Sequence, residues 1–362
     1  MTTPGKVLRA LAAGLLMCVL ASCGSQAPGN DSPAAPESTR ASSGGDLLPP
    51  AEGKTQYPLT LESPWGTSEL KQRPTRVVAL GWYHDAEYMA SMGATPVMVF
   101  PRVLEEEWMK DAFPHPVEAT VKDAEGAYTM EEIAKLKPDL ILFTSANLSD
   151  NYDKLKTIAP VVTTSTDDPD AKGPWQDRMR AVAKALDLSD AAEAALKKYD
   201  EDFAALRAQY PQFAGKTVNA TEYFGAQDGL AMTNTEGTTA ESLFDAMGFA
   251  QSPLRSAVPD TYLSNEQLGE LDADLLLTID STYNAEAGTS DISQLTDLPL
   301  YQNLNVVKNG HAITIAETGT SYIHQGTEHP GILSWGINTS GPIGQLWAAK
   351  VLAPIFAEPL GG

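Results

Sequence analysis

The most informative hydrophobic pattern in this chain occurs twice. Residues 129–142 read TMEEIAKLKPDLIL and residues 264–277 read SNEQLGELDADLLL. Each segment opens with a hydroxyl residue that is followed three positions later by Glu or Gln, which is the capping-box signature of a helix start. Apolar residues then recur at helical spacing, and a continuous apolar run follows that is typical of a strand covered on both faces. The pattern predicts a short amphipathic helix and a buried strand in each copy.

The segments around the two copies also correspond, and in the same order. RVVALGW (76–82) and KTVNATEYF (216–224) predict strands, and each is followed by a predicted helix that ends at a Met-Gly pair. YDKL at 152–155 and YQNL at 301–304 each precede a further apolar strand. We therefore expect an α/β fold made of two related lobes, each with a mostly parallel sheet and flanking helices.

One long helix is predicted between the two halves. Apolar residues recur at helical spacing from 189 to 210, Ser189 is a suitable N-cap, and Pro211 would stop the helix. Such a helix of ~22 residues would be about 33 Å long, which is close to the width of a small domain. We expect it to join the lobes as a stiff bridge, with a ligand cleft between them. A final packing helix is predicted from 341 to 357, interrupted at Pro354.

The N-terminus has the features of a bacterial lipoprotein signal. Lys6 and Arg9 form a basic region, and residues 10–21 are an apolar run too short to span a membrane. The run ends in small residues before Cys23, whose thiol is the expected lipidation site. An ordinary signal peptide with a chance cysteine is the alternative. Cys18, the other cysteine of the chain, would leave with the signal, so no disulfide is expected.

Composition defines the boundaries of the expected segments. The stretch after Cys23 is rich in Pro, Ser, Gly and Ala and has hardly any large apolar group to bury. The expected organisation is a signal peptide at 1–22, a lipidated disordered tether at 23–55, an N-terminal lobe at 56–172, a linking helix region at 173–211, and a C-terminal lobe with its tail helix at 212–362.

Charge excludes one class of partner. The formal charge of −22 becomes −24 once Lys6 and Arg9 are removed. Nucleic-acid affinity comes from Lys and Arg, so a nucleic-acid partner is not expected. The acidic balance weakly favours a neutral or cationic ligand.

Taken together, these segments resemble a known family. The segments that show the resemblance are RPTRVVALGWYHDAEYMASMGATPV, the paired segments 129–142 and 264–277, YDKLKTIAPVV and the linking helix. Together they extend over about 57–345. The chain resembles the periplasmic-binding-protein class that serves ATP-driven importers of ferric siderophores, haem and cobalamin. The resemblance implies an extracytoplasmic, lipid-anchored, monomeric protein that captures a ferric siderophore and delivers it to the permease subunits of an ABC importer. Haem or cobalamin is the alternative ligand, and no resident cofactor is expected.

The resemblance also implies a role for two repeated carboxylates. In relatives, an acidic residue in the first turn of each repeated helix pairs with arginines of the permease, and the matching positions are Glu131 and Glu266. The alternative is that Glu is favoured in any first helical turn by the helix dipole.

Residues that follow the predicted strands are candidates for the cleft, because ligands of open α/β sheets lie beyond the carboxyl ends of strands. Aromatic rings there would suit a bulky, partly apolar chelate, and Arg102 could meet an anionic oxygen with a forked contact. Core packing is the alternative for the aromatic residues, and an ion pair with one of Glu105, Glu106 and Glu107 is the alternative for Arg102. The candidates after strands are Trp82, Tyr83, Arg102, Tyr223, Phe224, Tyr283, Tyr322 and His324. Two further candidates are Tyr128, just before the first capping box, and Trp175, near the start of the linking helix region.

Histidines raise the question of a direct metal site. His84, His324 and His329 could in principle supply a haem axial ligand or a transition-metal site. A siderophore provides its own donor atoms to iron, so we expect no metal ligand from the protein.

The sequence does not favour an enzyme. It contains no G-x-S-x-G elbow, no G-x-x-x-x-G-K-[ST] loop and no H-E-x-x-H motif. An extracytoplasmic hydrolase remains the alternative from another class, and a structural or adhesion lipoprotein is a third.

Overall fold

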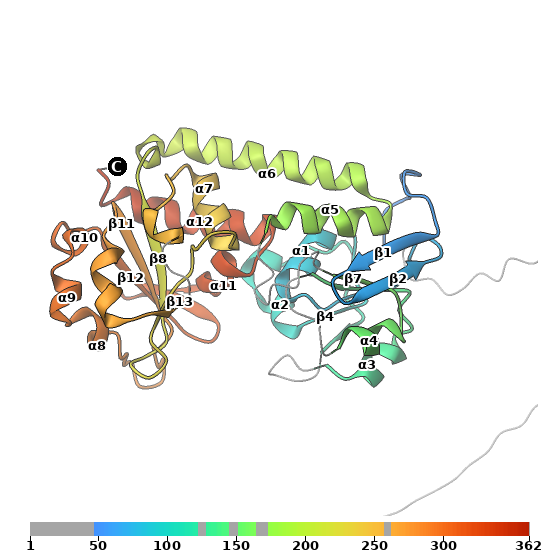
Figure 1. Ribbon diagram of the computed structural model, residues 1–362, viewed down its shortest axis with the longest axis horizontal. Helices are drawn as coiled ribbons and strands as arrows, with labels where there is room; N and C mark the ends of the chain where they lie inside the picture. Colours follow the sequence, from blue (N-terminus) through green and yellow to red (C-terminus); the bar gives the residue numbers. More distant parts are fainter. Residues whose placement is uncertain (1–46, 122–127, 145–150, 164–172, 257–261, 362) are drawn as a thin grey trace, which may run out of the picture. The chain divides into compact units, whose positions relative to one another are not determined.

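The computed structural model describes residues 47–121, 128–144, 151–163, 173–256 and 262–361 (Figure 1). The N-terminal lobe contains a five-stranded parallel sheet in the order β5-β4-β3-β6-β7. Its strands are β3 (Val77–Ala79), β4 (Met98–Val99), β5 (Ala119–Thr120), β6 (Leu140–Phe143) and β7 (Val161–Thr163). The hairpin of β1 (Leu59–Ser63) and β2 (Gly66–Leu70) packs beside β7. The helices are α1 (Trp82–Ser91), α2 (Pro101–Glu105), η1 (Glu107–Met109), α3 (Met130–Lys135), α4 (Tyr152–Lys156) and α5 (Trp175–Leu186).

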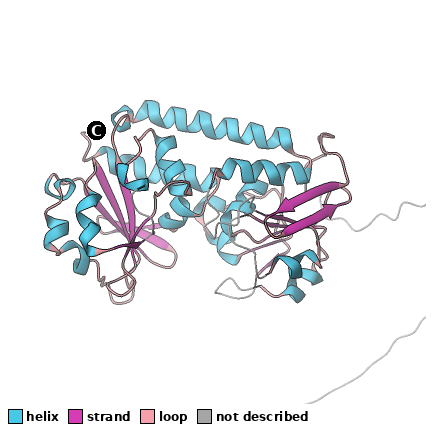
Figure 2. Ribbon diagram, viewed as in Figure 1, coloured by secondary structure: helices cyan, strands magenta, loops and turns pink. Residues whose placement is uncertain are grey.

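The C-terminal lobe contains a seven-stranded mixed sheet in the order β10-β9-β8-β11-β12-β13-β14. Its strands are β8 (Val218–Tyr223), β9 (Leu230–Met232), β10 (Tyr262–Leu263), β11 (Leu275–Asp280), β12 (Ala312–Glu317), β13 (Ser321–His324) and β14 (Thr327–Pro330). The helices around it are η2 (Pro211–Phe213), α7 (Thr239–Met247), η3 (Pro253–Ser256), η4 (Asn265–Leu271), α8 (Ser293–Thr296), α9 (Pro299–Gln302), α10 (Asn305–Lys308) and α11 (Leu333–Asn338). Figure 2 shows helices against both sheets.

The two repeated segments occupy equivalent places, which confirms the predicted duplication. β6 lies between β3 and β7, and β11 lies between β8 and β12, in parallel register on both sides. The shared aspartates also act alike. Asp139 accepts the backbone N–H of Thr75 at 2.8 Å, and Asp274 accepts that of Thr217 at 2.9 Å. Each aspartate therefore joins the start of the repeated strand to the start of its neighbour.

The repeated helices differ in type. Thr129 and Glu132 form the predicted capping box at α3, and the carboxamide oxygen of Gln267 accepts the backbone N–H of Ser264 at 3.0 Å. However, the second copy is a 3₁₀ helix, η4, rather than an α-helix. Gly269 lies inside it, and glycine disfavours the α-helix interior.

The C-terminal sheet is less parallel than predicted. Only β8, β11 and β12 run parallel, whereas β9, β10, β13 and β14 are joined to it in antiparallel pairs. The reason is the length of the connections. β9 returns from β8 through a six-residue turn closed by the Gly229 N–H to the Gly225 carbonyl (2.7 Å), and a parallel partner would need a longer crossover.

Two helices, rather than the single predicted one, join the lobes. α6 (Ser189–Gln209) follows α5 and extends past both sheets (Figure 1). α12 (Pro342–Ala357) packs along α6 and also contacts α1 and α7. Its first turn is held in the N-terminal lobe by Glu87, and its last turn is held in the C-terminal lobe by Phe356, which packs on Phe244 and Phe249.

The tail helix is not interrupted at Pro354, contrary to the prediction. α12 continues to Ala357 with Pro354 inside it. Proline cannot donate a backbone hydrogen bond, so the helix loses one bond at Pro354. Phe356, which follows the proline, is fully buried, and its packing holds the last turn in place.

Residues 47–55 are attached to the lobe, although the sequence predicted a disordered tether up to residue 55. Leu48 is buried, and the carboxylate of Asp187 accepts the N–H groups of Gly53, Lys54 and Thr55, each at 2.8 Å. The sequence predicted Ser189 as the N-cap of α6, but its side chain does not cap the helix. The Glu52 carboxylate does so instead, because it accepts the N–H groups of residues 190 and 191 at 2.7 and 2.9 Å.

Within the described ranges, no helix combines the length and the apolar character needed to cross a bilayer.

Candidate ligand-binding site

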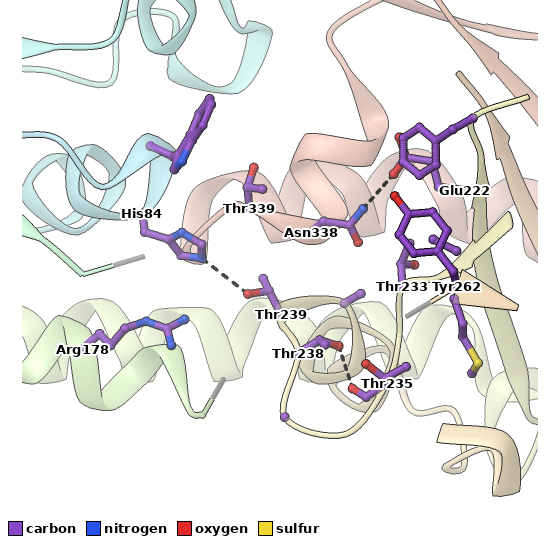
Figure 3. A pocket seen from close by; sticks show the side chains of 16 residues that line it. His84, Arg178, Glu222, Thr233, Thr235, Thr238, Thr239, Tyr262, Asn338 and Thr339 are labelled. Atoms are coloured by element: carbon purple, nitrogen blue, oxygen red, sulfur yellow. Dashed lines mark hydrogen bonds between the residues drawn. The ribbon is translucent and has the colours of Figure 1, made fainter. Parts of the chain in front are cut away.

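A cavity of about 370 Å³ lies between the lobes (Figure 3). The N-terminal lobe contributes Trp82 and His84 from α1 and Arg178 from α5. The C-terminal lobe contributes side chains from β8, β9, β10, α11 and the start of α7. These are Glu222, Phe224, Ala231, Met232, Thr233, Thr235, Gly237, Thr238, Thr239, Ala240, Tyr262, Asn338 and Thr339.

Three exposed aromatic rings line the cavity. Trp82 is 41% exposed and stacks on Phe100 with ring centroids 5.4 Å apart. Phe224 and Tyr262 lie next to each other on the wall formed by the C-terminal lobe, with ring centroids 6.3 Å apart. Trp82 begins α1 with a positive φ of 49°, a conformation that is uncommon outside glycine and that often marks a functional site. Flat aromatic faces open to solvent offer contact area to an organic ligand.

A run of threonines forms the polar wall. In the sequence GTTAESL, Thr238 caps α7 by accepting the Glu241 N–H at 3.2 Å. Thr239 is the first residue of the helix, and its hydroxyl lies 3.4 Å from Nε2 of His84. This contact joins the two lobes behind the cavity. Burial, followed by the charge of Arg178, lowers the pKa of His84 well below its ordinary value, so the imidazole is neutral at neutral pH.

Opposite charges lie in different parts of the wall. Arg178 is 8% exposed, and its Nη1 donates to the carbonyl of Gly173 at 3.2 Å. Glu222 accepts from Ser281 Oγ at 2.7 Å and from Asn338 Nδ2 at 3.4 Å. Burial raises the pKa of Glu222 above its ordinary value, and the bond from Ser281 partly offsets this rise.

Of the ten residues predicted to face the cleft, Trp82 and Phe224 line this cavity. Four others are buried in the core. Tyr83 donates to Glu106 at 3.2 Å, and Trp175 packs between Tyr88 and Tyr199. Tyr223 and Tyr322 are the other two. In this conformation these four side chains have little or no exposed surface that a ligand could contact. Their positions correspond to the alternative in which the aromatic rings pack in the core.

The remaining four lie elsewhere. Arg102 donates to the Gly319 carbonyl at 2.8 Å and lies 5.0 Å over the ring of Trp335, so it joins the lobes beside the cavity. Tyr128 packs edge-on against Phe143. Tyr283 and His324 are partly exposed, after β11 and at the end of β13 respectively, and do not line the cavity.

Sequence reasoning did not select several residues that line the cavity, such as Arg178, Glu222 and Tyr262. Glu222 lies inside the predicted strand 216–224, two positions before the selected Phe224, and it was not selected because the rule took only residues at the end of the strand. The threonine cluster had a usable signal, since GTTAES is a helix start. Arg178 carried no signal, because an arginine in an amphipathic helix is usually on the surface.

The histidines do not gather into a metal site. His84 lines the cavity, whereas His324 and His329 lie on the β13–β14 hairpin, where His329 stacks on Tyr322. Among the described residues, no group of three or more His, Cys, Asp and Glu side chains is placed to hold a metal ion.

The two proposed docking carboxylates are on the surface. Glu131 lies in the first turn of α3 and Glu266 in the first turn of η4, and both side chains are exposed. Cys23 and most of the predicted tether lie outside the described residues.

Two α/β lobes that share a cavity, joined by helices that span both, define a solute-binding protein. The family described as Periplasmic binding protein matches residues 77–318, and the chain belongs to this family. It is therefore a binding protein and not an enzyme.

Relatives and solved structures agree with this assignment. The chain is 26% identical over 270 residues to the probable siderophore-binding lipoprotein YfiY of Bacillus subtilis, covering 70% of this chain and 78% of the relative. It is 26% identical to the Fe(3+)-citrate-binding protein YfmC of the same organism, covering 68% and 74%. The structure of Staphylococcus aureus SirA complexed with staphyloferrin B shares the fold, with a TM-score of 0.59, 23% identity and coverage of 83% and 98%. Streptococcus pneumoniae PiaA also shares it, with a TM-score of 0.66, 19% identity and coverage of 83% and 99%.

Proposed function

We propose that this chain is the extracytoplasmic binding protein of an ABC importer, and that it captures a ferric siderophore in the cavity between its lobes. The observation that carries the proposal is a cavity whose wall is built from both lobes and bears exposed aromatic rings from each. A ligand bound there would contact both lobes at once, so the bound state would differ at the surface from the empty one. The names of the relatives, which include siderophore-binding and Fe(3+)-citrate-binding proteins, support the same ligand class.

The chemistry of the wall suits a chelate. A siderophore wraps iron in its own oxygen donors, so the protein has only to recognise an organic surface with polar oxygens. Trp82, Phe224 and Tyr262 supply apolar contact, and the threonine hydroxyls supply hydrogen bonds. The cavity volume of about 370 Å³ lies in the usual range for small-molecule sites.

Anchoring and docking complete the proposal. Lipidation at Cys23 would hold the protein, as a monomer, on the outer face of the membrane, and the segment before Leu47 would serve as the tether. Glu131 and Glu266, one on each lobe and both exposed, would pair with basic residues of the permease. Equivalent positions in a duplicated fold would let the permease contact both lobes in the same manner.

A binding panel tests the proposal. The purified chain without residues 1–22 is titrated with ferric hydroxamates, ferric catecholates, ferric carboxylates, haem and cobalamin, with tryptophan fluorescence and native mass spectrometry as readouts. We expect one-to-one binding of at least one ferric chelate at micromolar concentration or below, with quenching of Trp82. If every ferric chelate fails to bind while haem or cobalamin binds, the proposed ligand class is wrong. If nothing in the panel binds, the proposal as a whole is wrong.

A further inference from the structure

A carboxylate and two aromatic rings lie on one face of the C-terminal sheet. Glu222 on β8 lies directly opposite Ala231 on β9, and Ala231 lies directly opposite Tyr262 on β10. Directly paired residues point to the same side of a sheet, and so do residues two positions apart, which places Phe224 on the side of Glu222. All four residues line the cavity. The carboxylate and the two rings therefore surround one small side chain.

Ala231 leaves a gap between its larger neighbours. Adjacent strands are about 4.8 Å apart, so the backbones of Glu222 and Tyr262, which are two strands apart, are separated by roughly 10 Å. Only the methyl group of Ala231 projects from the sheet between them, and the space above it belongs to the cavity. A gap of this width would admit an ammonium group, because a cation is attracted to a ring face within about 6 Å of its centre.

Both aromatic rings beside the gap are open to solvent. Tyr262 is 55% exposed and Phe224 is 38% exposed, and both are among the large apolar side chains that remain exposed on the described part of the chain. Their planes are inclined by 52° to each other rather than stacked. Inclined ring faces can contact one cation together, as in the aromatic cages that bind organic ammonium groups.

Glu222 has lone pairs available for such a group. One carboxylate oxygen accepts from Ser281 Oγ at 2.7 Å and the other from Asn338 Nδ2 at 3.4 Å, and both of these partners are neutral. A carboxylate has about four acceptor positions, so lone pairs remain for the N–H donors of a ligand. Burial raises the pKa of Glu222, and a bound cation would stabilise the ionised form and lower this pKa again.

The charges of the cavity wall favour the same orientation. Glu222 is the single acidic side chain among the lining residues that the structure describes. Figure 3 shows Glu222 and Tyr262 together on one side of the cavity and Arg178 on the other. A cationic group of a bound ligand would therefore be directed toward Glu222 and away from Arg178.

We propose that Glu222, Phe224 and Tyr262 form a subsite for an ammonium group of the ligand. The carboxylate accepts the N–H donors of this group, and the two ring faces contact its charge. The ligand is then a ferric chelate that carries a protonated amine, rather than one whose outer groups are neutral or carboxylate. This inference rests on the proposed function, since it specifies the chemistry of the same site.

The first test compares two probes that differ in one charge. Ferrioxamine B holds iron through hydroxamates and carries a primary amine that is protonated at neutral pH. Acetylation of this amine removes the charge and leaves the hydroxamates unchanged. We expect the whole mature chain to bind ferrioxamine B at least ~10-fold more tightly than its N-acetylated form, because only the first probe can make the charged contact.

Removal of the carboxylate charge should affect only one probe. Glu222→Gln keeps the size of the side chain, and we expect it to weaken ferrioxamine B by about 10- to 100-fold and the N-acetylated form less than twofold. Asp228→Asn is the matched control. Asp228 lies on the exposed turn between β8 and β9 and does not line the cavity, so its removal should change neither affinity more than about twofold.

The aromatic contact is tested at an exposed residue, whose replacement leaves the core intact. Tyr262→Leu keeps apolar area but removes the ring face, so it should weaken ferrioxamine B about 3- to 10-fold and the N-acetylated form less than twofold. Tyr262→Phe keeps a ring face and should lose less affinity than Tyr262→Leu. If Glu222→Gln does not fold, these two variants decide the question in its place.

The outcomes distinguish the subsite from the proposed function. Equal affinity for the two probes, or tighter binding of the N-acetylated one, overturns the ammonium subsite. An equal loss for both probes in Glu222→Gln also overturns it. If neither probe binds while another ferric chelate does, the subsite is wrong and the proposed function still stands. If nothing in the wider panel binds, the proposed function itself is wrong.

Discussion

The hydroxyl of Tyr199 on α6 donates to the side-chain oxygen of Gln345 on α12 at a distance of 2.5 Å, and both residues are buried. The amide nitrogen of Gln345 in turn donates to the Thr239 carbonyl and to Ser242 Oγ on α7, each at 3.1 Å. One side chain therefore joins the two lobe-spanning helices to the helix that borders the cavity.

Replacing this glutamine should destabilise the protein strongly. Gln345→Leu leaves the Tyr199 hydroxyl buried without its partner, whereas the Thr239 carbonyl still accepts from Ser242 Oγ at 2.8 Å, so we expect a loss of about 1–3 kcal/mol in the free energy of unfolding. Tyr199→Phe should cost about 1–2 kcal/mol. Urea unfolding of both single variants and the double variant measures the effect. Because the residues share one network, the double variant should lose less than the sum, and strict additivity would contradict the contact.

Stability should depend on pH in an unusual direction. Burial raises the pKa of Glu87, Glu106 and Glu317 from the ordinary 4.5 to about 7 in each case, and backbone and side-chain hydrogen bonds partly offset this. Between pH 4.5 and 7 the folded chain then holds more protons at these groups than the unfolded chain does. Their contribution to the free energy of unfolding should therefore fall as pH rises through this window and be constant above it.

The contribution of one of these groups is measured by comparing the protein with a variant. This comparison is needed because the lowered pKa of His84 changes the free energy of unfolding in the opposite direction below pH 6.5. We expect Glu87→Gln to be less destabilising at pH 8 than at pH 5, since the glutamine avoids burying a charge at the higher pH. Urea unfolding at both pH values measures the difference. An identical cost for Glu87→Gln at pH 5 and pH 8 would contradict the prediction.

The two tryptophans predicted to face the cleft should now behave differently. Trp82→Ala removes an exposed ring from the cavity wall, so it should weaken chelate binding by about 10- to 100-fold with little loss of stability. Trp175→Phe alters a fully buried ring and should lower stability by about 1–3 kcal/mol while affinity stays within twofold. Fluorescence titration and urea unfolding of both variants decide this. Loss of affinity only in the Trp175 variant would reverse the assignment.

Docking to the permease can be separated from ligand binding. The double reversal Glu131→Lys with Glu266→Lys should abolish uptake of the radiolabelled ferric chelate by cells and leave its affinity for the purified protein unchanged. The control pair is Glu201→Lys on α6 with Glu286→Lys in the loop after β11, and both of these side chains are also exposed. Normal uptake in the first pair would exclude the docking role.

The start of α6 offers a small but clear test. Glu52→Ala removes the carboxylate that accepts two N–H groups at the helix start, and we expect a loss of about 1 kcal/mol. Ser189→Ala should cost less than about 0.5 kcal/mol, because this hydroxyl does not cap the helix. An equal cost for both substitutions, measured by urea unfolding, would contradict the assignment.

The duplicated fold was predictable because its signals are local. The capping boxes, the buried strands and the shared Asp139 and Asp274 all fall within 14-residue segments, so comparing the chain with itself was enough to find them. The Glu52 cap and the α12 bridge were not predictable in this way. Both depend on contacts between residues more than 130 positions apart, and nothing in the local pattern of either partner shows them.

The site was only partly predictable, and the reason is geometric. The rule that ligands lie beyond strand ends selected Trp82 and Phe224, which both line the cavity. It also selected Tyr223, and Trp175 was chosen for its place near the start of the linking helix region. Both are buried, because a pattern of apolar residues does not show which aromatic ring is covered by another element. Arg178 reaches the cavity from the middle of a chain segment with no strand end nearby. The cavity wall has one arginine and one glutamate, so its local charge differs from the strongly acidic average of the chain.

The position of α12 has a consequence for how the two lobes depend on each other. The core of the first lobe is completed by residues that follow the second lobe in the chain, since the Glu87 carboxylate accepts the backbone N–H groups of Gly341, Ile343 and Gly344. A truncation just before Gly341 would remove these three donors and leave the buried carboxyl group with the indole N–H of Trp108. We therefore expect neither lobe to reach its full stability when it is expressed without α12.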